Sequence, residues 1–144
     1  VNVSKRGPAM RDYVGPGGFP DIVDSARTVL FVGTWMANAE FSVADGKFRV
    51  VRQGMPKFVA KVDETTLSGR EALRLGKRIF YVTNVGVFRL TEQGLELVQV
   101  VPGVDIERDI RDLLVPPDRL RQDKSLRQTT AQKADAILAR LPWA

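Results

Sequence analysis

The stretch that decides the fold is residues 15–35, which read GPGGFPDIVDSARTVLFVGTW. Its first four residues contain three glycines, which supply the backbone freedom that a sharp turn needs. Pro20 suits the first turn of a helix, and the Asp21 carboxylate is favoured at the positive end of the helix dipole. Residues 28–35 are rich in β-branched and aromatic side chains and predict a strand buried on both faces. The order of turn, short helix over about residues 20–26 and strand favours an α/β chain.

Short apolar alternation elsewhere predicts more β-structure. The segments are residues 1–4, 41–43 with 47–50, 58–62, 78–83, and 85–91 with 94–101, and residues 53–56 read as a turn. Asp45-Gly46 is the preferred pair for a type I′ hairpin turn, because both central residues need positive φ. Two hairpins bring antiparallel pairs, so the sequence predicts a mixed sheet and not a plain doubly wound one.

Capping signals mark the remaining helices. Ser68 and Glu71 fit a capping box, which predicts a helix over residues 69–75 that Gly76 ends. Asp105 is the expected cap of a helix whose apolar residues share one face. Residues 118–128 are polar, and the apolar spacing over 131–141 predicts a last amphipathic helix. We therefore divide the chain into residues 1–117, the main unit, and 118–144, a linker with a terminal helix.

The amino-acid composition limits the kinds of chemistry that the chain can perform. The chain has 144 residues, 44% of them apolar and 27% charged, which is typical of a globular chain with a real core. It contains no Cys and no His, so thiolate nucleophiles, imidazole bases and metal sites built on these residues are excluded. The sequence predicts no metal site. No apolar run is long enough to span a membrane and no leader is visible, so we expect a cytoplasmic protein that does not bind membranes.

The net positive charge leaves a second interpretation of the protein's function open. A net charge of +5 and a pI near 9.9 favour an anionic partner. Many Lys and Arg residues, however, sit beside acids, as in Glu107-Arg108-Asp109. Aromatic residues do not interleave with the basic ones as they do on stacking surfaces. A non-enzymatic basic module that binds an acidic partner or nucleic acid remains the alternative, and salt-dependent DNA binding would support it.

The glycine cluster is the candidate site. Gly17 and Gly18 lack a Cβ atom, so their amides can approach a ligand at the start of a helix, where an anion or a developing oxyanion is stabilised. The plain alternative is a tight strand-to-helix turn, and spacing alone favours it. Neither a dinucleotide fingerprint nor a P-loop is present. No acid stands out as a nucleophile among Glu40, Asp63, Glu64, Glu71 and Glu92, and Trp35 and Trp143 are interpreted as packing residues.

Several separate motifs, taken together, resemble the family I coenzyme A (CoA) transferases of the 3-oxoacid and acetate type. The resemblance covers about residues 1–116, in order, and falls in the carboxyl-terminal part of the family's second half. The matching segments are residues 1–5, 15–19, 21–23, 25–29, 33–34, 68–69, 81–83, 87–90, 94–97 and 102–110. It implies a fragment of the family's α/β/α sandwich with a mixed sheet and two β-hairpins.

The resemblance also implies a mechanism. In this family a glutamate attacks an acyl-CoA and becomes a glutamyl-CoA thioester, from which a short carboxylic acid takes the CoA. That glutamate lies upstream of the segment that matches Val1, so we expect this chain to contain no catalytic residue and to be inactive alone. The strand-like start at Val1, which is not Met, predicts a truncated chain or a subunit whose partner supplies the nucleophile.

The resemblance also implies which residues form the site. Gly17 and Gly18 should border the CoA thioester, Gly15 should shape the turn, and Asn2 and Ser4 should lie on a strand near the pocket. CoA is a substrate, and no separate cofactor is expected. Some relatives have a Lys near CoA soon after the strand at 28–34, but residues 35–40 contain none. A homo-oligomer and a role in ketone-body or short-chain acid metabolism complete these expectations.

Overall fold

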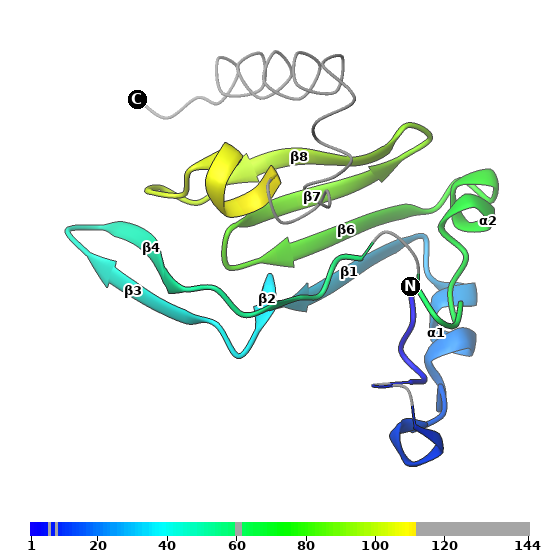
Figure 1. Cartoon of the computed structure of the whole chain (residues 1–144). Helices are drawn as coiled ribbons and strands as arrows, with labels where there is room; N and C mark the ends of the chain where they lie inside the picture. The colour runs from blue at the N-terminus through cyan, green and yellow to red at the C-terminus, as the bar shows by residue number, and fades with distance from the viewer. Residues whose placement is uncertain (6, 8, 60–61, 112–144) are drawn as a thin grey trace, which may run out of the picture.

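The computed structural model describes residues 1–5, 7, 9–59 and 62–111 of the chain. Its helical elements are η1 (Met10–Asp12), α1 (Phe19–Ser25), α2 (Gly69–Arg74) and η2 (Ile106–Arg111). Its strands are β1 (Thr28–Gly33), β2 (Met36–Ala37), β3 (Glu40–Ala44), β4 (Lys47–Arg52), β5 (Met55–Pro56), β6 (Arg78–Thr83), β7 (Gly86–Thr91) and β8 (Gly94–Val100). Figure 1 shows these elements around one main sheet, with α1 and α2 near the same end of it.

The main sheet is mixed, as the sequence predicts. Its strand order is β1-β6-β7-β8, in which β1 and β6 are parallel and the other neighbours are antiparallel. The β3–β4 hairpin forms a separate two-stranded sheet that reaches away from the main sheet (Figure 1). Its turn residues Asp45 and Gly46 have φ of 52° and 68°, so the type I′ prediction is confirmed. The α/β class and both hairpins are confirmed with it.

One face of the main sheet carries the aromatic core. Phe31 on β1 stacks on Tyr81 of β6 at a ring-centroid distance of 5.2 Å. Trp35, only 2% exposed, stacks on Phe88 of β7 at 4.9 Å and packs against Phe58 at 4.6 Å. The prediction that Trp35 is a packing residue is confirmed. Offset and tilted aromatic pairs of this kind add to the free energy gained from burial alone.

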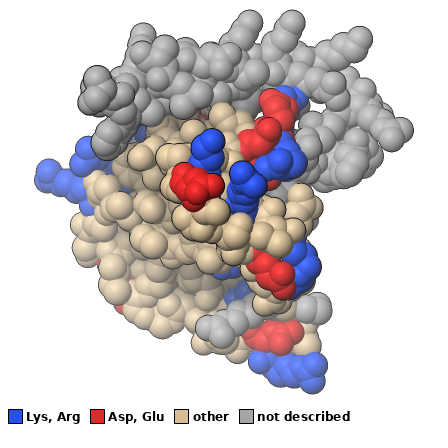
Figure 2. All heavy atoms as spheres, turned by 90° about the vertical axis from the view of Figure 1, so that its left-hand side faces the viewer, with Lys and Arg blue, Asp and Glu red and all other residues tan. Residues whose placement is uncertain are grey.

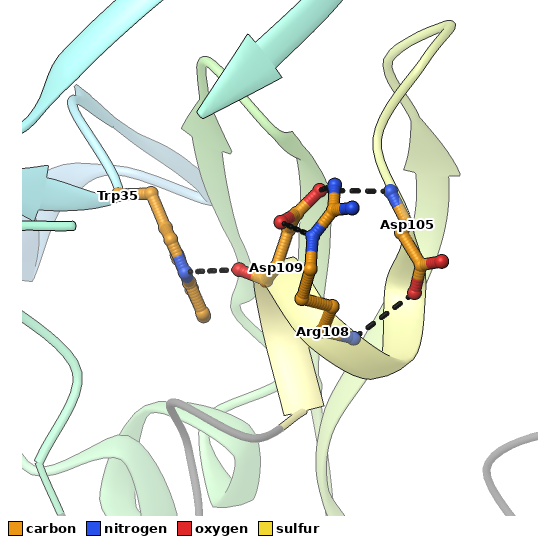
Figure 3. Close-up of polar contacts among 4 residues, drawn as sticks. All are labelled: Trp35, Asp105, Arg108 and Asp109. Carbon is orange, nitrogen blue, oxygen red and sulfur yellow. Dashed lines mark hydrogen bonds and ion pairs between the residues drawn. The ribbon is translucent and has the colours of Figure 1, made fainter. Parts of the chain in front are cut away.

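A polar cluster closes this core (Figure 3). The buried Asp109 carboxylate accepts two hydrogen bonds of 2.7 Å from the Arg108 guanidinium and one of 2.9 Å from the Asp105 amide. The Asp105 carboxylate in turn accepts the Arg108 amide at 3.0 Å, which confirms Asp105 as a cap. Trp35 Nε1 donates to the Asp109 carbonyl oxygen. The element that Asp105 caps is a single π-helical turn, η2, within the described residues.

Within the described residues, nothing covers the opposite face of the sheet at β1. Leu30 and Val32 point away from the aromatic core and are 59% and 80% exposed. The prediction that residues 28–35 are buried on both faces is therefore wrong for this face. The strand sequence is apolar on both sides, as in a central parallel strand, yet β1 is at the edge of the described sheet. No described element covers Leu30 and Val32.

Other local predictions had mixed outcomes. Residues 1–4 are not a strand, and a single bridge between Lys5 and Tyr13 is the only strand-like pairing nearby among the described residues. Residues 58, 59 and 62 are also outside any strand, because Phe58 turns into the aromatic core. Residues 53–56 were expected as a turn, but Met55–Pro56 form the short strand β5 beside β2.

The helix predictions are confirmed at α1 and α2. The Ser68 hydroxyl accepts the Glu71 amide at 3.3 Å, and Gly76 has a φ of 71° after α2. The second half of the capping box is replaced by an ion pair, because the Glu71 carboxylate contacts Arg74 at 2.6 Å. The predicted linker at 118–128, the helix at 131–141 and Trp143 lie outside the described residues. Among the helices that are described, none is long and apolar enough to cross a membrane.

Candidate active-site turn

The turn at residues 15–18 is open to its surroundings. Gly15 and Gly17 have φ of 72° and 55°, a left-handed conformation that glycine adopts without steric cost. Gly18 has a φ of −80°. A Cβ atom added at any of the three positions would meet no other atom within 4 Å. An incoming ligand can therefore come close to this backbone.

The amides of the turn are available to such a ligand. The Pro16 carbonyl oxygen accepts a hydrogen bond of 3.2 Å from the Phe19 amide, and the Gly18 carbonyl oxygen accepts one of 3.1 Å from the Ile22 amide. The turn therefore leads directly into α1. The Gly17 and Gly18 amides donate no hydrogen bond to any residue that the structure describes. Two neighbouring N–H groups without an internal acceptor are suited to an oxyanion.

Ser4 holds the entrance of the turn. Its carbonyl oxygen accepts the Val14 amide at 2.8 Å and the Gly15 amide at 3.1 Å. Ser4 is 1% exposed, so these bonds are shielded from water. The structure thus brings Ser4 and Gly15 together, and it does so through the backbone of Ser4.

Asn2 organises the segment around Ser4. The Asn2 Oδ1 atom accepts the Ser4 and Lys5 amides, both at 3.1 Å, and the Ser4 hydroxyl at 3.3 Å. A side-chain oxygen that caps the amides two and three residues later forms a compact turn and not an extended strand. This is the physical reason that the strand predicted at residues 1–4 does not form. Contact of Asn2 and Ser4 with a ligand stays a prediction.

The far side of the turn is fixed on the main sheet. The Phe19 ring lies 5.9 Å from the Phe31 ring on the aromatic face. Val23 on α1 is buried as well. The turn is therefore anchored by Ser4 at its start and by Phe19 at its end, while Gly17 and Gly18 stay exposed between the two anchors.

Comparison with known proteins identifies relatives of this chain. The chain is 41% identical over 101 residues to the acetate CoA-transferase YdiF of Escherichia coli O157:H7. It is 37% identical over 115 residues to the caffeate CoA-transferase of Acetobacterium woodii. These alignments cover 69% and 78% of this chain but only 19% and 22% of the relatives. No family model matches the chain.

Solved structures agree with the sequence relatives. The crystal structure of the acyl-CoA transferase YdiF apoenzyme from E. coli O157:H7 superposes with a TM-score of 0.72 at 37% identity. A YdiF thioester complex with CoA gives the same TM-score at 38% identity. The chain belongs to the family I coenzyme A transferases. Its superposition covers 78% of this chain and 22% of the apoenzyme chain, so it spans about a fifth of the transferases that it matches.

Within this CoA-transferase segment, Thr66 contacts the site although no local sequence pattern indicates it. Its hydroxyl oxygen lies 3.0 Å from the Ser4 hydroxyl oxygen and accepts the Val3 amide at 3.2 Å. In the sequence Thr66 precedes the cap Ser68 by two residues and resembles any loop threonine. Only the tertiary fold, which lays residues 66–67 along Val1, brings it to the site.

Lys57 is the second residue that sequence reasoning missed. Its Nζ atom donates to the Thr34 hydroxyl at 2.7 Å, immediately after β1. Residues 35–40 contain no Lys. The structure shows that Lys57, which follows β5, brings a cation to the carboxyl end of β1 from a different part of the chain.

The carboxylates of the transferase segment are mostly engaged at the surface. Glu40 pairs with Arg52 at 2.6 Å, and the Glu64 carboxylate accepts the Tyr13 hydroxyl at 3.2 Å. The negative charge of Glu64 raises the pKa of Tyr13, and the hydrogen bond between them acts in the same direction. The hydrogen bond from Arg74 lowers the pKa of Glu71. Within the described part of the chain no three acidic side chains gather as metal ligands.

The charged surface does not favour the nucleic-acid alternative. Figure 2 shows several Lys and Arg side chains directly beside Asp and Glu on the face that it draws. Ion pairs on the β-structure include Arg52 with Glu40 and Arg89 with Glu96, both at 2.6 Å. Basic side chains neutralised by neighbouring acids present a weak field to a polyanion.

Proposed function

We propose that this chain supplies the thioester-binding turn of an enzyme that transfers CoA between an acyl-CoA and a short carboxylic acid. The single observation that carries the proposal is the open turn at Gly17 and Gly18, whose amides donate to no acceptor among the residues that the structure describes. The names of the relatives, an acetate and a caffeate CoA-transferase, support the reaction class. The acyl group and the acceptor acid of this protein are left open.

The nucleophile in this proposal is a glutamate outside the 144 residues. Its carboxylate attacks the acyl-CoA carbonyl, the C–S bond breaks, and a mixed anhydride and CoA thiolate form. The thiolate then attacks the glutamyl carbonyl of the anhydride, which releases the first carboxylic acid and leaves the glutamyl-CoA thioester. A second carboxylate takes the CoA by the reverse of these steps. The glutamate is regenerated at the end of each cycle.

The role of the turn is electrostatic. Each attack on a carbonyl puts negative charge on its oxygen in the tetrahedral intermediate, and amides placed in advance stabilise that charge without reorganisation. Gly17 and Gly18 offer such amides at a point where the lack of Cβ atoms leaves room for a thioester. Loss of one donor of this kind typically costs about 100-fold or more in kcat.

The assay that tests the proposal compares two proteins. The complete polypeptide that contains this segment should transfer CoA from acetyl-CoA or acetoacetyl-CoA to short carboxylic acids, and it should form an enzyme–CoA thioester visible as a mass increase. The 144-residue chain alone should show little or no transfer, because it supplies the turn and not the nucleophile. Robust turnover by the chain alone would contradict the assignment of the glutamate.

A cytoplasmic location, a homo-oligomeric state and a role in short-chain acid metabolism belong to the same proposal. They follow from the resemblance to the transferases and from the composition. Gel filtration with light scattering of the complete polypeptide tests the oligomeric state directly.

A further inference from the structure

A short hydrogen-bonded path connects Thr66 to the glycine turn. Thr66 Oγ1 lies 3.0 Å from Ser4 Oγ, and the Ser4 carbonyl oxygen holds the Gly15 amide at 3.1 Å. The Thr66 and Leu67 amides also donate to the Val1 carbonyl oxygen, at 2.9 and 3.1 Å. The loop before α2 therefore supports the segment that supports the turn.

The donor and the acceptor of each hydrogen bond on this path follow from the number of protons that each group carries. The Asn2 Oδ1 atom can only accept, so the Ser4 hydroxyl proton goes to Asn2. The Ser4 oxygen is then an acceptor, and the Thr66 hydroxyl donates to it. Thr66 Oγ1 is left to accept the Val3 amide at 3.2 Å. Thr66 thus uses its hydroxyl as donor and acceptor at once, which neither Val nor Ala can reproduce.

We propose that Thr66 is a positioning residue for CoA transfer, because its hydroxyl fixes Ser4 and thereby the placement of the Gly17 and Gly18 amides. The inference rests on the proposed function and adds to it a residue outside the glycine turn. Thr66 does not touch the turn itself. Its effect reaches the amides only through Ser4 and the Gly15 backbone.

This role predicts a specific kinetic signature. Donors aimed at an oxyanion act more strongly in the transition state than on the bound substrate. A displaced turn should therefore lower kcat and leave KM for the acyl-CoA nearly unchanged. A misplacement of about 1 Å can cost roughly 100-fold. Because the Ser4 backbone bonds to Val14 and Gly15 remain, we expect a smaller loss, of about tenfold.

The test uses the complete transferase polypeptide with three variants. Thr66→Val keeps the shape of the side chain and removes both hydrogen bonds, so kcat should fall about tenfold, as should the rate of enzyme–CoA thioester formation measured by mass spectrometry after rapid mixing. Thr66→Ser keeps the hydroxyl and should restore at least half of the wild-type kcat. Ser4→Ala removes the same contact from the other side without added bulk and should reproduce the loss.

A matched control removes a threonine hydroxyl elsewhere. Thr91 Oγ1 donates to the Gly94 carbonyl oxygen in the β7–β8 turn, and Thr91→Val should leave kcat unchanged. The double variant Ser4→Ala/Thr66→Val should lose clearly less than the sum of the two single losses, since both single variants remove the Ser4–Thr66 hydrogen bond, and each also removes one further bond, Ser4 to Asn2 or Val3 to Thr66. Additive losses would show that the two residues act separately and would overturn the inference.

The remaining outcomes separate the two proposals. Wild-type kcat in Thr66→Val, or no recovery in Thr66→Ser, refutes the role of Thr66 and leaves the transferase function intact. If Thr66→Val does not fold, a wild-type kcat in Ser4→Ala refutes it equally. Absence of CoA transfer by the wild-type complete polypeptide refutes the proposed function, and the role of Thr66 falls with it.

Discussion

The indole Nε1 of Trp35 donates a hydrogen bond of 3.1 Å to the main-chain carbonyl oxygen of Asp109, and both residues are 2% exposed. Figure 3 shows this contact beside the ion pair of Asp109 with Arg108. It joins the loop after β1 to the last described turn of the chain. The aromatic face of the sheet is thereby closed by a polar contact that water does not reach.

Trp35→Phe should destabilise the fold by about 2–3 kcal/mol. The change leaves the Asp109 carbonyl without its donor and leaves a void next to Phe58 and Phe88. The urea-unfolding midpoint should fall without a change in slope. Tyr13→Phe, which removes an exposed hydroxyl, is the control and should change the free energy of unfolding by less than about 0.5 kcal/mol. Equal midpoints for Trp35→Phe and wild type would contradict the structural role.

The Asp109 carboxylate should make stability depend on acid pH. Hydrogen bonds from Arg108 lower its pKa, burial opposes them, and the Asp105 amide lowers the pKa further. A group with a depressed folded-state pKa contributes stability above its unfolded value of about 3.9, and that contribution is lost as pH falls through the folded value. We therefore expect the free energy of unfolding to decrease as pH is lowered below about 4.

Asp109→Asn isolates this contribution. The variant should be less stable than wild type at pH 7 and should show a flatter decline in the acid range, because no carboxylate titrates at that position. Unfolding curves at several pH values measure both effects. A variant that keeps the full acid dependence of the wild type would assign the titration to other carboxylates.

Gly18→Ala should separate ligand clearance from folding. Gly18 has negative φ and open space at the Cβ position, so the substitution should change stability by less than about 1 kcal/mol. Under the proposed function, the added methyl group would enter the space expected for the thioester in the complete polypeptide, and kcat/KM for CoA transfer should fall about 100-fold. Gly33→Ala is the control, since its Cβ position is also open. Normal transfer by Gly18→Ala would mean that no substrate approaches this turn.

Gly86→Ala should show the opposite pattern, a loss of stability without a specific kinetic effect. A Cβ atom there would lie 2.4 Å from the Gln99 carbonyl oxygen and 3.0 Å from Leu97. The backbone of β8 must move to accept it, at a cost of about 1–3 kcal/mol. Thermal unfolding measures this, with Gly33→Ala again as the control. Unchanged stability would show that the β7–β8 hairpin adapts at Gly86 more easily than its geometry indicates.

Local signals predicted the local structure well. Asp45-Gly46, Ser68 and Gly76 each act through the backbone of neighbouring residues, and each lies where its chemistry requires. The glycine turn belongs to the same group, since its open geometry follows from residues 15–18. The helix that Pro20 begins is confirmed for the same reason.

The remaining features depend on contacts between distant segments. Thr66 and Lys57 reach the site regions only because the fold lays their loops beside Ser4 and Thr34. The strand expected at residues 58–62 is absent at residues 58, 59 and 62, and the Phe58 ring packs on Trp35 instead. Periodicity records which residues are apolar, but it does not record which neighbour buries them.

The bare side of β1 has a practical consequence for any work with this segment by itself. Leu30 and Val32 form an apolar strip beside an edge of β1 that no described strand pairs, and such edges recruit other polypeptides. When it is expressed separately, the segment should self-associate and bind to hydrophobic resins, and mild detergent should keep it in solution. Leu30 and Val32 are exposed in this segment and look like positions that tolerate substitution. In the complete polypeptide, however, they would be poor places for polar substitutions.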